Sequence, residues 1–235
     1  KKNIFSFLKI TYNAPVTLTF SLLAVAVLCA DSLLHKKIIS DFFSAPGNAQ
    51  SPLPFGITDA IDYIRLIFHV AGHSDWNHLI SNIAFILLLG PAVEEKYGSL
   101  LPALMMFIAS AVSGVLNACF SPLPLTGADS IAFMMILLTS FASIKKNEIP
   151  LSFILILILY IGKDIDFKSM QQNITTLSHI AGGLCGSMIA FLASPKKRAA
   201  KTAQEARLEE IDSQSPRFKK PAKQDNSTVV GTLKL

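Results

Sequence analysis

The sequence has few charged side chains for its length. Asp, Glu, Lys and Arg make up 16% of its 235 residues, whereas a typical soluble domain carries about 25%. The mean hydropathy is +0.48 and 51% of the residues are hydrophobic. Several apolar runs reach the length of about 20 residues that a helix needs to cross a bilayer. The composition therefore predicts an all-α polytopic membrane protein, with the lipid bilayer as its first partner.

Cysteine is also scarce. Cys29, Cys119 and Cys185 lie in or beside apolar runs, without a CxxC spacing or a histidine at ligand spacing. This pattern predicts neither a disulfide framework nor a zinc site, and we expect no metal and no cofactor. The net charge of +5 comes from chain ends and short loops. Aromatic and basic residues do not alternate as in single-strand-binding proteins, so we expect no nucleic-acid partner.

Six apolar segments are expected to cross the membrane as helices. They are residues 15–34, 77–93, 100–120, 128–144, 150–162 and 174–194. A signal peptide is the alternative for the first segment, but that segment is long for one and more spans follow. The long first loop contains an amphipathic stretch at residues 57–68, which predicts a short helix on the membrane surface.

The charge pattern predicts three parts and an orientation. Residues 1–14 form a cytoplasmic N-terminal segment, residues 15–194 the membrane domain, and residues 195–235 a basic, mostly disordered cytoplasmic tail. Lysine and arginine are more frequent in the loops on the side of both termini, which predicts that both ends are cytoplasmic in the plasma (inner) membrane. In this topology His78, Asp129 and His179 lie in the outer half of the membrane at similar depth.

Two polar side chains open the second predicted span. His78 and Asn82 are four residues apart and therefore lie on one face of a helix. The alternative is a polar helix start that faces water. The functional interpretation is a pair of donors for an oxyanion, since histidine and asparagine serve in that role.

Two further segments offer a nucleophile position and a base. Gly127-Ala128-Asp129-Ser130 begins the fourth span, and ionisable groups at such depth indicate function. His179 is followed by Gly182 and Gly186, a GxxxG spacing that lets another helix approach closely. If the two helices pack together, His179 lies beside residue 129 or 130.

The order and spacing of these motifs resemble the rhomboid family of intramembrane serine proteases. The matching segments are Arg65 in the first loop, residues 72–82 (GHSDWNHLISN), residues 94–99 (EEKYGS), residues 127–130 (GADS) and residues 178–182 (SHIAG) with Gly186. The resemblance implies a six-helix bundle around a water-filled cavity. It also implies that a Ser–His dyad cleaves transmembrane segments of other proteins, which are then the substrates or clients of this chain.

The resemblance also implies residue roles. His179 is the general base, and His78, Asn82 and the backbone N–H at the nucleophile position form the oxyanion hole. Glu94 braces the cytoplasmic ends of the second and third helices, and Arg65 is a structural residue of the first loop. The oligomeric state is left open.

The sequence departs from the family at the nucleophile position, where Asp129 replaces serine and Ser130 follows it. Three interpretations follow. Asp129 makes the protein an inactive, client-binding relative; Ser130 acts as a displaced nucleophile; or Asp129 is a substitution that silences a working serine protease. A small proton-conducting transporter is a further alternative, but no internal repeat of the transporter kind is visible.

Overall fold

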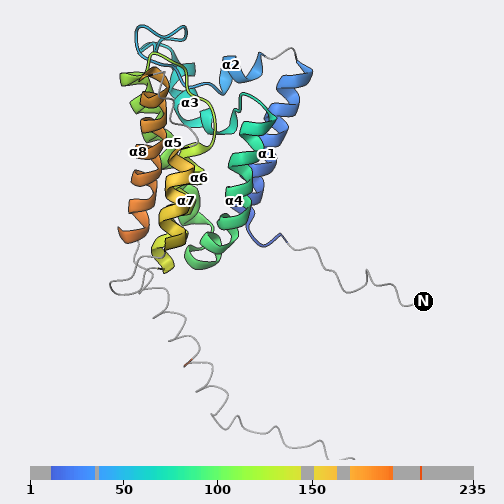
Figure 1. Cartoon of the computed structure of the whole chain (residues 1–235). Helices are drawn as coiled ribbons and strands as arrows, with labels where there is room; N and C mark the ends of the chain where they lie inside the picture. The colour runs from blue at the N-terminus through green and yellow to red at the C-terminus, as the bar shows by residue number, and fades with distance from the viewer. Residues whose placement is uncertain (1–11, 35–36, 144–150, 163–169, 193–206, 208–235) are drawn as a thin grey trace, which may run out of the picture. The chain divides into compact units, whose positions relative to one another are not determined.

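The computed structural model describes residues 12–34, 37–143, 151–162, 170–192 and Arg207. The chain divides into two units, Lys1–Ser194 and Pro195–Leu235. The predicted disordered tail, except Arg207, and most of the predicted N-terminal segment lie outside the described residues. In the first unit the elements, in chain order (Figure 1), are α1 (Pro15–Leu33), α2 (Ile38–Phe42), α3 (Ala60–Phe68), the 3-10 helix η2 (His69–Ala71), α4 (Trp76–Tyr97), α5 (Leu100–Phe120), α6 (Asp129–Ser143), α7 (Leu151–Gly162) and α8 (Met170–Leu192).

The all-helical prediction is confirmed, because the described residues contain helices and only two isolated β-bridges. Two helices are longer than predicted. Helix α4 continues past the predicted end at residue 93 to Tyr97, and its C-cap Gly98 has φ 74°. Helix α8 begins at Met170, before the predicted start at residue 174. Hydropathy marks only the apolar part of such helices, so it misses their polar ends.

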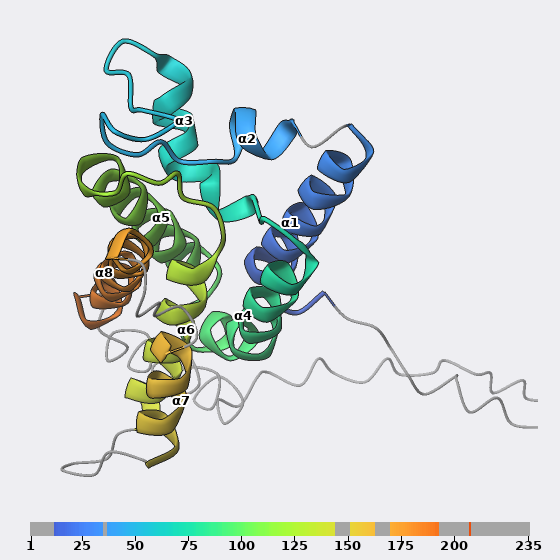
Figure 2. The same cartoon turned by 45° about the horizontal axis from the view of Figure 1, so that its top comes forward.

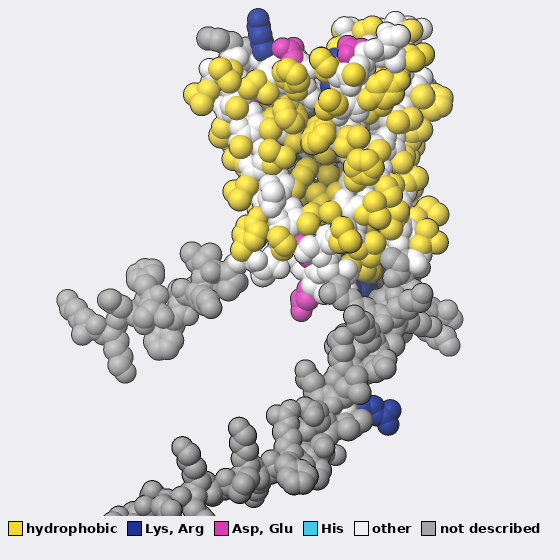
Figure 3. Space-filling view, turned by 180° about the vertical axis from the view of Figure 1, so that it is seen from behind, with side chains coloured by type: hydrophobic (Ala, Val, Ile, Leu, Met, Phe, Trp, Pro, Cys, Tyr) yellow, Lys and Arg dark blue, Asp and Glu magenta, His cyan; other side chains and the backbone are white. Residues whose placement is uncertain are grey.

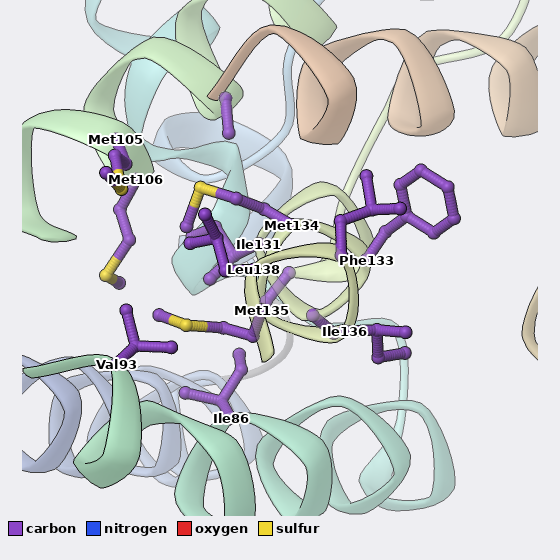
Figure 4. Packing of buried hydrophobic residues seen from close by; sticks show 14 of the residues in the cluster. Ile86, Val93, Met105, Met106, Ile131, Phe133, Met134, Met135, Ile136 and Leu138 are labelled. Atoms are coloured by element: carbon purple, nitrogen blue, oxygen red, sulfur yellow. The ribbon is translucent and has the colours of Figure 1, made fainter. Parts of the chain in front are cut away.

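Helix α6 is the centre of the bundle (Figure 2), where it contacts α4, α5 and α8. Every residue from Ile131 to Leu138 is at most 3% exposed. A helix that is apolar on all sides is expected to be buried. Figure 4 shows how its side chains fill the space between neighbours, with Met135 extending toward Ile86 and Val93 of α4.

Helix α7 has the opposite surroundings. Among its described side chains only Tyr160 is buried, at 6% exposed, whereas Leu159 is 73% and Ile158 is 61% exposed. An apolar helix with such exposure fits a lipid-facing position, as the run of Ile and Leu predicted.

Small residues of α8 fit it closely against two helices. A Cβ on Gly182 would meet Ala109 O at 2.5 Å, and one on Gly186 would meet Met105 O at 2.8 Å, both on α5. The approach to α6 depends on Gly183, where a Cβ would meet Ser130 O at 2.7 Å, and on Gly186, where a Cβ would also meet Met134 Sδ at 2.7 Å. Gly182 therefore faces α5, Gly186 lies between α5 and α6, and Gly183 faces α6.

Two predicted structural residues hold the ends of helices. The Glu94 carboxylate accepts hydrogen bonds from Thr17 N at 2.6 Å and Val16 N at 3.2 Å. It thus satisfies free N–H groups in the first turn of α1, which has no side-chain cap of its own. These bonds brace α4 against the first helix, and the expected brace of the second and third helices stays a prediction. Arg65 of α3 donates to Asp62 at 2.7 Å and, through Nε, to Asp41 O at 2.8 Å, which fixes α2 on α3.

Three described helices are long and apolar enough to cross a membrane: Pro15–Leu33, Trp76–Tyr97 and Leu100–Phe120. Figure 3 shows hydrophobic side chains over the side of the bundle, with charged groups near its two ends. This distribution is that of an integral membrane protein. The count of six spans stays a prediction, since α6 and α7 are shorter in the described residues.

Candidate functional site

A polar cavity of about 580 Å³ opens where α4 and α6 begin. Its walls come from the start of α4, the loop before α6, and the first half of α8. The lining residues are Ser74, Asp75, Asn77, His78, Ser81, Leu123, Pro124, Thr126, Asp129, Gln172, Thr175, Thr176 and His179. Polar walls inside an apolar bundle indicate a site that admits water.

The Asp129 carboxylate faces this cavity at the first turn of α6. Its Oδ2 accepts hydrogen bonds from His78 Nε2 at 2.7 Å and Asn82 Nδ2 at 3.0 Å. Asp75 caps α4 by accepting from His78 N at 2.9 Å, and this cap sets the direction in which His78 leaves the helix. The structure thus brings both predicted oxyanion donors to residue 129.

His179 reaches the same carboxylate from α8. Its Nε2 lies 3.9 Å from Asp129 Oδ2, so the shorter ion-pair contact of Asp129 is with His78 and not with His179. Residue 129 or 130 was expected beside His179, and in the structure the Asp129 side chain lies there.

Ser130 points away from the cavity. Its side chain is fully buried, and its Oγ lies 3.4 Å from Ser113 Oγ on α5. Each helical step turns a side chain by about 100°, so Asp129 and Ser130 face different neighbours. Ser130 is not among the described residues that line the cavity.

A tight loop delivers residue 129. Gly127 has φ 110°, and a Cβ on it would overlap the His78 ring. Glycine adopts this conformation without strain and leaves room for the imidazole. The next backbone N–H, of Ala128, donates to His73 Nε2 at 3.3 Å, and Gly127 N donates to His69 O at 3.1 Å.

The sequence analysis missed the roles of His69 and His73. Burial, the main cause, lowers the pKa of His73 to about 4 and that of His69 to about 3, so both rings are neutral at pH 7. A neutral His73 accepts the Ala128 hydrogen bond, which an imidazolium cannot do. His73 belongs to the motif at residues 72–82, but its spacing alone does not reveal this backbone contact.

Tyr160 was missed as well. Its hydroxyl donates to Asp129 O at 2.9 Å, and its ring packs edge-on against Phe85 and stacks on Phe133. It attaches the otherwise exposed α7 to the start of α6. The available signal was a tyrosine near the end of a run of Ile and Leu.

The chemistry of this arrangement depends on what residue 129 is. Two donors directed at one position stabilise negative charge there. With serine at position 129, they would face an acyl oxygen of a tetrahedral intermediate. With Asp129, they hold a carboxylate. No group of three His, Cys, Asp or Glu within the described ranges is arranged to hold a metal ion.

The sequence matches the family model of the Rhomboid domain over residues 61–196. This segment covers more than half of the chain and contains all four side chains that meet at the cavity. No curated protein sequence matches the chain. The all-helical bundle, the polar cavity and the matched segment lead to one assignment: the chain belongs to the rhomboid family, whose members are generally intramembrane serine proteases.

Proposed function

We propose that this protein admits transmembrane segments of other membrane proteins to its polar cavity, and that Asp129 keeps its Ser–His protease dyad silent. The proposal rests mainly on the Asp129 carboxylate. It occupies both oxyanion donors, His78 at 2.7 Å and Asn82 at 3.0 Å, while the Ser130 hydroxyl faces Ser113.

Two physical reasons support silence at this site. A carboxylate is a poor nucleophile toward an amide, and acyl transfer needs a hydroxyl beside its base. The carboxylate also places negative charge where a tetrahedral intermediate would develop its own. Ser130 offers no simple replacement, because a displacement of about 1 Å from attack geometry costs about 10²-fold in rate.

His179 Nε2 lies 3.9 Å from the Asp129 carboxylate, which supports descent from a serine endopeptidase with His179 as its base. We therefore predict that Asp129→Ser creates a nucleophile beside His179. The expected result is labelling of residue 129 by a fluorophosphonate probe, and cleavage of a single-span client in liposomes at least about 10²-fold above the original chain. The matched control is the double variant Asp129→Ser/His179→Ala, which keeps the hydroxyl and loses the base.

Two results would contradict the proposal. One is absence of labelling at residue 129 in the Asp129→Ser variant, despite an unchanged thermal unfolding midpoint. The other is cleavage of the client by the original chain that disappears in Ser130→Ala, which would make Ser130 the nucleophile.

The binding half of the proposal has its own test. A photo-cross-linker at Thr176, which lines the cavity from α8, is expected to capture a single-span client uncleaved. A cross-linker at Leu159, exposed on α7, is the comparison position. Equal capture at both positions would show lipid-like contact and not entry into the cavity.

We also propose the six-span topology, with both termini in the cytoplasm of the inner membrane. It is supported by the loop charges and the three long apolar helices. Reporter fusions at both termini should give the same cytoplasmic signal, and a periplasmic signal at one end would exclude an even number of spans.

A further inference from the structure

A chain of hydrogen bonds leads from the Asp129 carboxylate to the mouth of the cavity. Asp129 Oδ2 lies 2.7 Å from His78 Nε2. On the other side of the same ring, His78 Nδ1 lies 3.2 Å from Ser74 Oγ. Ser74, His78 and Asp129 all line the cavity.

The hydrogen-bond partners of His78 determine which of its ring nitrogens carries the proton. An ionised carboxylate only accepts, so His78 Nε2 carries the hydrogen and donates it to Asp129. In the neutral ring Nδ1 then has a lone pair, which accepts the Ser74 hydroxyl. A carboxylate that fixes the tautomer of a base, with the base next to a hydroxyl, is the arrangement of a nucleophile–base–carboxylate triad.

Exposure follows the same order. The Asp129 side chain is 4% exposed, the His78 side chain is 24% exposed, and Ser74 is exposed. Asn82 also donates to the carboxylate at 3.0 Å, which stabilises its charge. The reactive end of the chain is thus open to water, while the charge that supports it is buried.

The geometry points to a second reactive centre, in which Ser74 is a nucleophile, His78 its base and Asp129 the orienting carboxylate, acting on small activated esters that enter from the aqueous side. It goes beyond the proposed function, because it uses neither His179 nor a nucleophile at position 129. Asp129 then has two effects: it removes the family nucleophile and it completes a different relay.

The reaction is a balanced acyl transfer. Ser74 Oγ forms a bond to the ester carbonyl carbon, and its proton moves to His78 Nδ1. The C–O bond to the alcohol breaks, and the alcohol leaves with that proton. Water then attacks the acyl-serine, gives its proton to His78, and releases the acid while Ser74 recovers its hydrogen. Asn77, which lines the same cavity, offers an amide donor to the developing oxyanion.

Asp75 competes with His78 for the Ser74 hydroxyl. A substitution of Asp75 therefore tests whether the Ser74–His78 contact limits the reaction. Ser74 Oγ lies 3.1 Å from Asp75 Oδ2, while Asp75 Oδ1 caps α4. In Asp75→Asn the amide oxygen keeps the cap, so the NH₂ group takes the Oδ2 position and donates to Ser74. The Ser74 hydrogen is then directed at His78, and the reaction rate should rise severalfold.

The test uses the full chain in liposomes with a fluorophosphonate probe and peptide mass spectrometry. Cleavage after Arg65, Lys96 and Lys145 separates Ser74 from residue 129. We expect an adduct on Ser74, its loss in Ser74→Ala, and labelling slowed at least about tenfold in Asp129→Asn, which removes the charge that stabilises the imidazolium. Hydrolysis of p-nitrophenyl acetate should follow the same order.

Ser187→Ala is the matched control. Ser187 of α8 is not among the described residues that line the cavity, and its hydroxyl donates to Leu184 O, so labelling should not change. The inference is overturned if Ser74 carries no adduct in both the original chain and Asp75→Asn. It is also overturned if Asp129→Asn reacts as fast as the original chain, because Ser74 would then only orient His78. These outcomes are independent of the adduct at residue 129 that tests the silenced dyad.

Discussion

Asp129 and Ser130 are neighbours in the chain with opposite surroundings. Asp129 faces a cavity of about 580 Å³ and touches His78 and Asn82, whereas Ser130 is fully buried against α5 and α8. Both residues are polar, and both begin the same helix. The comparison shows that the rotation of a side chain about the α6 axis decides which residue has access to the base and the donors.

The surroundings of Asp129 and Ser130 also differ in how well they accommodate a substitution. The cavity side contains water-accessible polar groups that can reorganise around a new side chain. The Ser130 side is a crossing in which Gly183 already contacts Ser130 O with no space for a Cβ. Substitutions at position 129 should therefore change chemistry, and substitutions at position 130 should change stability.

The largest expected effect comes from placing a carboxylate at position 130, where the side chain is buried against α5 and α8. Ser130→Asp buries a charge against Ser113 without a described cation beside it, which should lower the free energy of unfolding by about 3–5 kcal/mol. Thermal unfolding in detergent measures this loss of stability. Asp129→Ser, at the position that faces the cavity, is the matched control. Equal unfolding midpoints of Ser130→Asp and Asp129→Ser would contradict the close packing around residue 130.

The second effect tests the loop before α6. This loop determines that Asp129 faces the cavity and that Ser130 faces α5. Burial lowers the pKa of His73 to about 4 from 6.5, so the unfolded chain binds a proton in this range that the folded chain does not. Stability should therefore fall as the pH decreases from 6.5 to about 4, by about 3 kcal/mol from this group. His69 acts in the same direction.

His73→Gln isolates this contribution, because the glutamine amide oxygen can accept from Ala128 N and has no proton to bind in this range. Unfolding midpoints of both proteins, measured across pH 4 to 6.5 (a window taken from the lowered pKa), should show a shallower decline in the variant. Parallel curves would indicate that His73 is not buried in its neutral form.

The third effect tests the tightness of the Ser130 side. In Gly183→Ala the new Cβ would lie 2.7 Å from Ser130 O and 2.7 Å from Phe133 Cδ1. Separating α8 from α6 should cost about 1–3 kcal/mol. Gly162→Ala on α7 meets nothing within 4 Å, and its unfolding midpoint should equal that of the original chain.

The sequence predicted the long helices and the short amphipathic helix of the first loop, but not α2 or η2. It also predicted that His78, Asn82 and His179 lie near residue 129. His78 and Asn82 share a helical face by their spacing, and the family resemblance supplied Asp129 and His179 as their counterparts. Such features depend on local periodicity and on motif order, both of which are visible in one sequence.

Other features depend on contacts between distant segments, which periodicity does not specify. Gly182 and Gly186 predicted a close helix crossing but not that α5 shares it with α6, and Gly183 gave no separate signal. The direction of Ser130 depends on the loop before α6, where Gly127 has φ 110° and fixes the direction in which the helix begins.

The smallest expected effect concerns the hydrogen bond from the Tyr160 hydroxyl of α7 to the first turn of α6. Tyr160→Phe keeps the ring between Phe85 and Phe133 and removes the hydroxyl that donates to Asp129 O at 2.9 Å. The free energy of unfolding should fall by about 1 kcal/mol, the contribution of a single neutral hydrogen bond. The same change in the Asp129→Ser background should lower kcat more than it changes KM, because the bond holds the backbone of the residue that attacks. If stability falls as expected and kcat does not change, Tyr160 only anchors α7. The Gly127 loop alone would then determine which side chain of α6 faces the cavity.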